Sequence, residues 1–496
     1  MIQGLIDALT PMALFWTFVG TSTGILVGAI PGLGGGMLMA LVLPLTFAMA
    51  PLSAILMLIG IHVGSVSGGL ISATLLKMPG TPSSVMTTFD GHPMALSGKP
   101  ERALSLGIGS SLIGGLFAGV VLALLAPPLS FWALKFGPWD LAALILVALV
   151  LVAAISQGSM LKGLFSATLG VVAALPGLAE SDGQLRYTFG FDDMAAGFRL
   201  LPVLLGVFVV SQLLNETDKA LGTGNLIRLG KRTAFPKLKV WRAQTGNIIR
   251  SSAIGTFVGI LPGVGASISA MVAYGMARTF SKTPEKFGTG HDEGIVASEA
   301  ANNANVGGAL IPLITLGIPG APVDALLLGA MVMHQIQPGP LLFTTNGNLV
   351  WAMIAAYFIA NIMMFVIMAG SYRQIARVIT IPTHYLVPVV FVFCVIGSFS
   401  TGSRLFDVWV MLGFGLLGYV LDRARVPLGP FIIGLVLATP FESELRTALQ
   451  LSDGSLLAIV DHPVALVFVV LSFVMLMMPL LRRPGRAVVI AEEEES

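Results

Sequence analysis

One short sequence pattern occurs twice in this chain, and each copy is expected to interrupt a helix. The pattern Gly-x-x-Val-Gly-x-x-Pro-Gly-x-Gly fits residues 24–34 and again residues 255–265. A further Pro-Gly pair follows each copy, at Pro79-Gly80 and at Pro319-Gly320. The first pair recurs after 231 positions and the second after 240. Because proline removes a backbone donor and glycine frees the backbone, the pattern predicts two related halves with helix breaks at equivalent places.

The composition indicates a membrane protein. Hydrophobic residues make up 55% of the chain and charged residues only 10%, and apolar runs of spanning length recur along it. We predict an all-α polytopic membrane protein of about 12 transmembrane segments, some of them broken or re-entrant. The segments would form two repeats, inverted if each repeat holds an odd number of spans. The net charge of +2 does not indicate nucleic-acid binding, and a single cysteine, Cys394, excludes an intrachain disulfide.

Charged loops give the expected orientation. The connector 216–250 carries eight basic residues against two acidic ones, whereas the loop from Gly177 to Arg199 is acidic. Since Lys and Arg favour cytoplasmic loops, we expect the connector and the tail 482–496 inside and the acidic loop outside. The chain then divides into a first membrane repeat at 12–215 and a second at 251–481. The first ten residues lack Lys and Arg, so the first apolar run is expected to be a retained span.

Several polar stretches lie between the apolar runs. His62 to Met78 is rich in Ser and Gly, so we expect a short buried helix or a re-entrant hairpin there. Asp90 to Arg102 and Arg278 to Glu293 are expected to be loops. Ala297 to Leu310 contains one glutamate and three asparagines, which are expensive in hydrocarbon and therefore indicate function.

Interrupted helices can bind ions and polar solutes. A half-helix N-terminus presents unpaired N–H groups and a positive dipole end to an anion, and unwound carbonyls can hold a cation. The alternative is that Gly and Pro only allow close packing and kinks. From the breaks and the polar residues beside them, we predict a substrate site formed by Gly32, Gly34, Pro79, Gly80, Thr81, Ser83, Ser84, Gly263, Ser267, Asn302, Asn303, Asn305, Pro319 and Gly320.

The candidates for ion coupling are Glu299, Asp324 and Asn303. Each has a structural alternative: the asparagine could join helices, Glu299 could be an interfacial charge, and Asp324 could form a structural pair. His62 and His334 are expected to be interfacial or hydrogen-bonded histidines and not proton carriers, and Lys77 is expected to reach the membrane surface. For Glu442, Glu444 and Arg446 a local ion pair is favoured over a site.

The strings around these positions resemble a known family. Residues 300–304 (Ala-Ala-Asn-Asn-Ala), 307–320 and 334–340 (His-Gln-Ile-Gln-Pro-Gly-Pro) look like the large membrane subunit of tripartite tricarboxylate transporters. In the first half, residues 79–83 and 90–95 look like the same family. The resemblance extends from Gly20 to about Gln450. Asp324 departs from it, because a small or hydroxyl residue is expected there, and this leaves the substrate and the coupling ion open.

The resemblance implies secondary active uptake of a carboxylate in the bacterial inner membrane. The solute would be a tricarboxylate, a dicarboxylate or a related organic acid, and its entry would be coupled to Na⁺ or H⁺, with no other cofactor. The implied partners are a small four-span membrane subunit and a periplasmic solute-binding protein.

Other function classes fit the sequence less well. An embedded hydrolase would need a nucleophile with a base, paired aspartates or a metal cluster, and the six histidines are scattered without a His-Glu-x-x-His motif. We therefore predict neither an enzyme nor a transition-metal site. A carrier that works without a binding protein, or a channel, remains the alternative, since polar broken helices also line pores.

Overall fold

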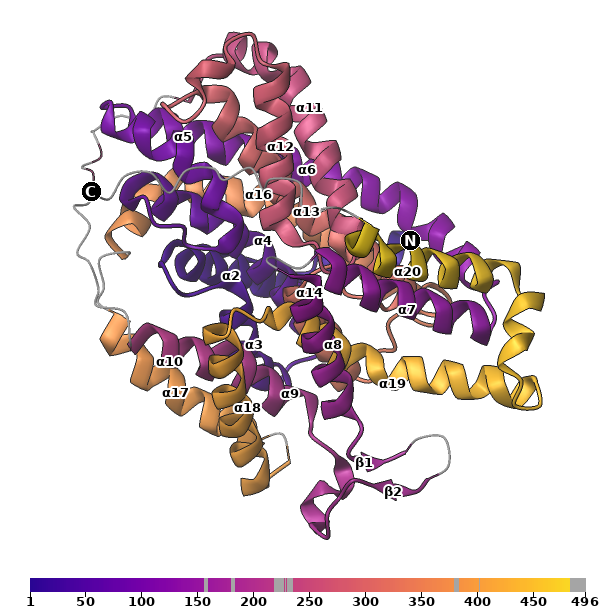
Figure 1. Cartoon of the computed structure of the whole chain (residues 1–496). Coiled ribbons are helices and arrows are strands. Elements are labelled where there is room, and N and C mark those ends of the chain that lie inside the picture. The colour runs from indigo at the N-terminus through magenta and orange to yellow at the C-terminus, as the bar shows by residue number, and fades with distance from the viewer. Residues whose placement is uncertain are drawn as a thin grey trace.

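The computed structural model describes residues 1–155, 159–179, 183–217, 227, 229, 235–378, 383–400 and 402–481, and these residues are mostly helical (Figure 1). Up to residue 217 the helices are α1 (Ile2–Ala8), α2 (Pro11–Ala29), α3 (Gly35–Thr46), α4 (Pro51–Leu76), η1 (Pro82–Ser84), α5 (Val85–Leu96), α6 (Pro100–Ala133), α7 (Pro138–Ile155), α8 (Met160–Ala174), η2 (Asp192–Ala196), α9 (Leu200–Leu204), η3 (Leu205–Val210) and α10 (Ser211–Thr217). The last three form one continuous helix, of which η3 is a π-helical turn.

The second part of the chain is also helical. Its elements are α11 (Leu238–Ile260), α12 (Gly265–Phe280), η4 (Pro284–Lys286), α13 (Asp292–Leu316), α14 (Pro322–Met333), α15 (Leu342–Thr345), α16 (Gly347–Val378), α17 (Thr383–Ser400), α18 (Leu405–Arg423), α19 (Leu428–Leu451), η5 (Leu456–Asp461) and α20 (Pro463–Leu481).

Six helices of the described chain are long and apolar enough to cross a membrane: α2, α4, α6, α16, α18 and α19. Shorter apolar helices, among them α3, α8 and α14, accompany them. A chain with several such helices crosses the bilayer more than once, because helices satisfy their own backbone hydrogen bonds in lipid. The prediction of a polytopic helical membrane protein is therefore confirmed.

Each of the four Pro-Gly pairs lies between two helices, as predicted. One pair separates α2 from α3, and its counterpart separates α11 from α12. The other two separate α4 from η1 and α13 from α14. Gly32 and Gly263 have φ angles of 85° and 76°, which favour glycine strongly because other residues clash there.

Glycines bring α2 against α4 and α11 against α13. A Cβ at Gly28 would lie 2.1 Å from the carbonyl oxygen of Ser65, and a Cβ at Gly259 would lie 2.4 Å from that of Asn305. Only glycine fits at such distances, and close approach of this kind is a common way for helices to associate in membranes. The two interhelical contacts hold α4 and α13 in the interior of the helical assembly.

For His62 to Met78 the expected burial inside the protein is confirmed, but the expected short or re-entrant structure is wrong. α4 runs without interruption through most of this stretch to Leu76, and its apolar span is buried entirely inside the protein. The expectation rested on the polarity of Ser and Gly, which would be unfavourable against lipid. Since α4 contacts other helices, these small residues serve for packing instead.

The expected loop from Asp90 to Arg102 is mostly helical. α5 continues to Leu96 and α6 begins at Pro100, so only a short turn separates them. The expected loop from Arg278 to Glu293 is closer to the structure, because α12 ends at Phe280 and α13 begins at Asp292.

A small hairpin interrupts the helices within the acidic loop. Strands β1 (Gly177–Leu178) and β2 (Leu185–Arg186) pair in antiparallel fashion, with Gly177 opposite Arg186. Figure 1 shows this hairpin extending away from the helices. The all-α prediction therefore needs this addition.

Much of the charge on which the orientation rests lies outside the described residues. The last residues of the connector form the N-terminal part of α11, which includes Lys239, Arg242 and Arg250. The following predicted loop and tail charges lie beyond the described ranges: Glu180, Asp182, Lys219, Arg228, Lys231, Arg232, Arg482, Arg483, Arg486 and the acidic run Glu492 to Glu495.

Candidate functional site

The polar side chains of α4 and α13 meet in the protein interior. Ser67 on α4 donates to Oδ1 of Asn303 on α13 at 2.5 Å. Nδ2 of Asn303 donates to the Glu299 carbonyl at 3.1 Å, and the Tyr357 hydroxyl on α16 donates to the Asn303 carbonyl at 3.2 Å. Asn303 therefore joins three helices from distant parts of the chain, and its side chain already has its partners.

Asn302 lies beside this junction without a partner. It is fully buried, and neither Oδ1 nor Nδ2 has a hydrogen bond within the described chain. An unpaired buried polar group costs about 1–3 kcal/mol, so a ligand that offers both a donor and an acceptor would recover free energy here. Asn305 differs, because its Nδ2 approaches the Gly255 carbonyl at 3.5 Å.

Glu299 is buried one turn before Asn302 and is held by two hydroxyl groups. Thr87 on α5 donates to Oε1 at 2.5 Å, and Ser111 on α6 donates to Oε2 at 3.1 Å. The side chain is fully buried inside the protein. Its carboxyl group links α5, α6 and α13.

Asp324 is buried in the first turn of α14 and faces α4. Its Oδ1 lies 3.4 Å from Nδ1 of His62, and neither carboxyl oxygen has a hydrogen bond to the described residues. His62 is buried in the middle of the apolar helix α4, and not at the end of an apolar run as expected. His334 directly follows α14, at the end of an apolar run as expected.

The hydroxyl groups after Pro79-Gly80 close a tight turn. Thr81 and Ser83 share a hydrogen bond of 2.9 Å between their hydroxyl groups, and Ser84 Oγ donates to the Thr81 carbonyl at 2.8 Å. All three residues are buried. The hydroxyls thus form the N-terminal turn of η1 and leave further lone pairs for a solute.

The Pro-Gly glycines pack against the preceding helices. A Cβ at Gly80 would lie 2.1 Å from the Gly28 carbonyl oxygen, and one at Gly320 would lie 2.8 Å from that of Gly259. The Gly263 N–H also donates to the Gly320 carbonyl at 2.7 Å. These positions therefore need glycine for packing, whether or not a solute approaches them.

The remaining predicted positions lie at the same breaks. The Gln212 side chain donates to the Gly32 carbonyl, and Gly34 caps the N-terminus of α3. Ser267 is half-buried in the first turn of α12. Pro79 is half-buried and Pro319 is buried.

The helices that begin at the breaks meet across the two halves of the sequence. α3 packs against α14, and α12 packs against η1 and α5. The central helix α4 touches α3, η1 and α14, while α13 touches α12, η1 and α14. The four elements that begin at the breaks therefore each contact α4, α13 or both, and a helix N-terminus close to polar side chains could bind an anion.

Asp90 is a buried anchor that the sequence analysis missed. Its Oδ1 accepts the backbone N–H groups of Gly288, Gly290 and His291 at 2.7–3.0 Å, and its Oδ2 accepts the Tyr274 hydroxyl at 2.8 Å. The carboxylate thereby ties α5 to the turn before α13. The only signal in the sequence was its place in a family-like string, since its polarity suggested a loop.

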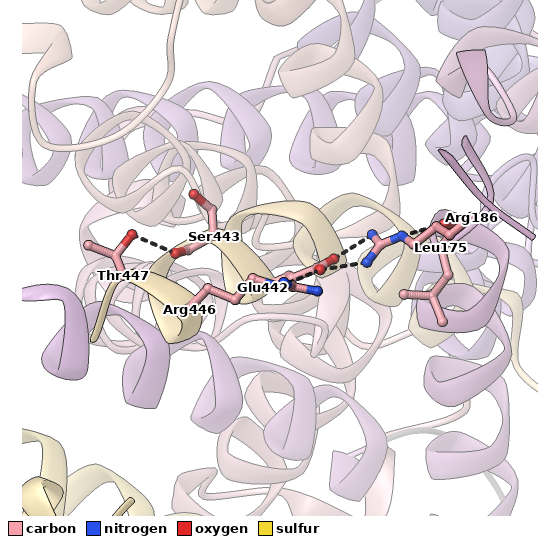
Figure 2. A network of polar contacts seen from close by, with 6 residues as sticks. All are labelled: Leu175, Arg186, Glu442, Ser443, Arg446 and Thr447. Atoms are coloured by element: carbon pink, nitrogen blue, oxygen red, sulfur yellow. Dashed lines mark hydrogen bonds and ion pairs between the residues drawn. The ribbon is translucent and has the colours of Figure 1, made fainter. Parts of the chain in front are cut away.

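A second polar network lies near the hairpin and away from the central junction. Figure 2 shows Arg186 of β2 binding both oxygens of Glu442 on α19, each at 2.6 Å. Arg446 adds a contact of 2.9 Å to the same carboxylate. The preference for a local ion pair over a site is supported for Glu442 and Arg446, with Arg186 as an unforeseen third member.

Comparison with known proteins identifies the family. The model of the tripartite tricarboxylate transporter TctA family matches residues 14–433. The chain belongs to this family. This TctA-family chain is therefore a membrane component of a transporter and not an enzyme, and the resemblance found in its sequence is confirmed.

Two relatives from Agrobacterium vitis are similar to the TctA-family chain. One is described as an uncharacterized 52.8 kDa protein in the TAR-I ttuC' 3' region; it is 35% identical over 466 residues, which cover 93% of this chain and 92% of that protein. The other, an uncharacterized protein in the TAR-II ttuC' 3' region, is 36% identical over 227 residues, or 46% of this chain and 94% of the relative. No solved structure matches the chain.

Proposed function

We propose that this chain is the membrane carrier of a secondary active system that takes up a carboxylate, coupled to Na⁺ or H⁺. The solute would be a tricarboxylate, a dicarboxylate or a related organic acid. The observation that carries the proposal is the unpartnered amide of Asn302 on α13, a helix that contacts three of the four elements beginning at the breaks. Hydroxyls and helix N-termini would receive the carboxylate, and the Asn302 amide would complete its hydrogen bonds.

The two halves of the carrier are proposed to be repeats, inverted in the membrane. Matching contacts support this idea. Gly28 meets Ser65 as Gly259 meets Asn305, at offsets of 231 and 240 positions. Gly80 then approaches the Gly28 carbonyl as Gly320 approaches that of Gly259. Four contacts that obey the same two offsets are hard to reconcile with composition bias.

The proposed site would bind a charged solute weakly, so the solute would be delivered by a partner protein. A helix dipole end contributes only about 0.3–2 kcal/mol toward binding one charge, so a multiply charged solute would be held weakly. A periplasmic solute-binding protein would raise the local concentration of solute at the outer face. We propose this protein and a small four-span membrane subunit as partners, in the bacterial inner membrane.

Uptake of labelled carboxylates into proteoliposomes tests the proposal. The purified chain alone should show little uptake at low solute concentration, and adding the small subunit with loaded binding protein should restore it. Saturable uptake at low solute concentration by the chain alone would favour an autonomous carrier. Downhill flux that ignores every imposed ion gradient would favour a channel.

A further inference from the structure

Asp324 and His62 form a buried pair, and the backbone N–H of Ala321 is the other group that the described chain brings to the Asp324 carboxyl. The carboxyl oxygen Oδ1 lies 3.4 Å from the imidazole Nδ1, slightly beyond ordinary hydrogen-bond length. Both carboxyl oxygens and Nδ1 are buried, and none of the three has a hydrogen bond within the described ranges. The pair joins the middle of α4 to the first turn of α14, so it connects a central helix of the first half to the helix that follows Pro319-Gly320.

The elements packed against this pair add few titratable groups. α2, α3, α9 and η1 carry none, while α4 and α14 carry only the pair itself. Groups on the other packed helices have partners elsewhere: Glu299 of α13 with Thr87 and Ser111, Tyr357 of α16 with Asn303, Asp90 and His92 of α5 with backbone groups, Arg102 of α6 with Asp292, and Glu442 of α19 with Arg186 and Arg446.

The other charges on the packed helices lie far along them. Tyr372, Arg373 and Arg377 of α16 are at least 15 residues beyond Tyr357, roughly 22 Å of helix. α19 meets α14 near Gly429, and its Glu442 and Glu444 are at least 13 residues further on, roughly 20 Å. The remaining titratable groups lie at helix ends. They are Lys77 after α4, Glu101 at the start of α6, Asp292 and Glu293 at the start of α13, Arg199 before α9, and His334 after α14. Arg199 pairs with Asp407.

We propose that His62 and Asp324 together carry the coupling proton of this transporter. The inference rests on the proposed carboxylate uptake and selects H⁺ over Na⁺ as its coupling ion. A hard cation such as Na⁺ is suited by oxygen ligands, whereas an imidazole nitrogen beside a single carboxylate suits it poorly. Both members of the pair can bind and release a proton, and no transition-metal chemistry is required.

The coupling step moves one proton and no electrons. With a neutral imidazole and an ionised carboxylate, the pair has a charge of −1. A proton from the outer side then forms one N–H bond at His62 or one O–H bond at Asp324, which makes the pair neutral. The same bond breaks when the proton leaves toward the cytoplasm. Because a buried net charge is expensive in a membrane interior, the neutral pair passes between outward- and inward-facing states more easily.

The test uses the chain reconstituted with its small subunit and binding protein. Uptake of a labelled carboxylate is measured in Na⁺-free medium with an acidic exterior, and counterflow of labelled against unlabelled solute is measured without any gradient. We expect the wild type to accumulate solute under the pH gradient and to make the outer medium more alkaline as it does so. Asp324→Asn should lose accumulation and alkalinisation while it keeps counterflow.

Two further variants control for structure. Asp453→Asn removes an exposed carboxylate in a turn where φ is 48°, a conformation that asparagine tolerates, and should behave like the wild type. His62→Gln keeps a polar side chain but removes one of the two protonation sites and leaves the buried Asp324 charge without its imidazole, so both accumulation and counterflow should fall. If the variants fail to fold, alkalinisation by the wild type still tests the proposal.

The outcomes separate the two proposals. Wild-type accumulation that follows a Na⁺ gradient at constant pH and ignores a proton gradient would overturn proton coupling but leave carboxylate transport intact. Proton-driven accumulation by Asp324→Asn equal to the wild type would also overturn it. If the wild type shows neither uptake nor counterflow of any carboxylate, the proposed function itself fails.

Discussion

Two Pro-Gly regions, residues 79–84 and residues 319–324, share a backbone arrangement and differ in their side chains. In both, the glycine of the Pro-Gly pair approaches the carbonyl of a glycine on an earlier helix of the same half, Gly80 with Gly28 and Gly320 with Gly259. The side chains that follow are unlike. The first region has Thr81, Ser83 and Ser84, whereas the second has Ala321, Val323 and Asp324 at the same offset of 240 positions.

This difference separates packing from function. The glycines allow the same close packing in both regions, so their presence says little about solute binding. The first region completes its own turn with hydroxyl groups, while the second leaves a carboxyl group without a hydrogen bond in the described chain. The equivalent positions on the central helices differ too, with His62 in one and Asn302 in the other. We therefore expect the regions to tolerate the same backbone changes and to differ in their response to side-chain changes.

The largest effect is expected from breaking the shared backbone packing. Gly28→Ala and Gly259→Ala would each place a methyl group within about 2.5 Å of a carbonyl oxygen, and overpacking of this kind costs about 1–3 kcal/mol. Thermal unfolding of the purified variants in detergent measures the loss. The matched control is Gly275→Ala on α12, where a Cβ meets nothing within 4 Å and helix propensity favours alanine. Similar losses for both variants would support equivalence, and a loss at only one of them would contradict it.

Asn302 should show a large functional effect without a loss of stability. Asn302→Ala removes a buried amide that has no partner in the described structure, so its unfolding temperature should be unchanged or slightly higher. Carboxylate uptake should fall strongly if the amide binds the solute. Asn303→Ala is the comparison, because it breaks the bond to Ser67 and should lower both stability and uptake. Normal uptake by Asn302→Ala would remove this residue from the site.

Removing the charge of Glu299 should reduce proton-driven solute accumulation less than removing the charge of Asp324. Glu299→Gln keeps one carbonyl oxygen for Thr87 or Ser111, so the cost should be about 0.5–1.5 kcal/mol for a weakened hydrogen bond. Accumulation driven by a pH gradient should persist in this variant. If it is abolished while Asp324→Asn still accumulates solute, the coupling group belongs to α13 and the assignment to α14 is wrong.

The smallest effect is expected at Ser83. Its hydroxyl contacts that of Thr81, and Ser83→Ala keeps the hydrogen bond from Ser84 to the Thr81 carbonyl. The stability change should stay within about 1 kcal/mol, measured by thermal unfolding. A raised half-saturation concentration for uptake with an unchanged maximal rate would indicate that the hydroxyl also contacts the solute. Unchanged kinetics would limit its role to the turn.

The sequence by itself determined the helix breaks and the class of the protein. Proline and glycine act on the backbone within a few residues, so the four interruptions could be located without tertiary information. Apolar runs of spanning length likewise indicate membrane segments without tertiary information. The same local reasoning was right about the burial of His62 to Met78 but wrong about its length, because Ser and Gly do not interrupt a helix that packs among other helices.

The tertiary structure decided which polar groups have partners. Ser67 meets Asn303 at a separation of 236 residues, and Asp90 meets three backbone N–H groups about 200 residues later. Nothing local to Asp90 distinguishes an anchored carboxylate from one in a loop, and nothing local to His62 reveals Asp324 beside it. Since such pairings depend on how distant helices pack, their burial and hydrogen bonding emerge only when the helices are assembled.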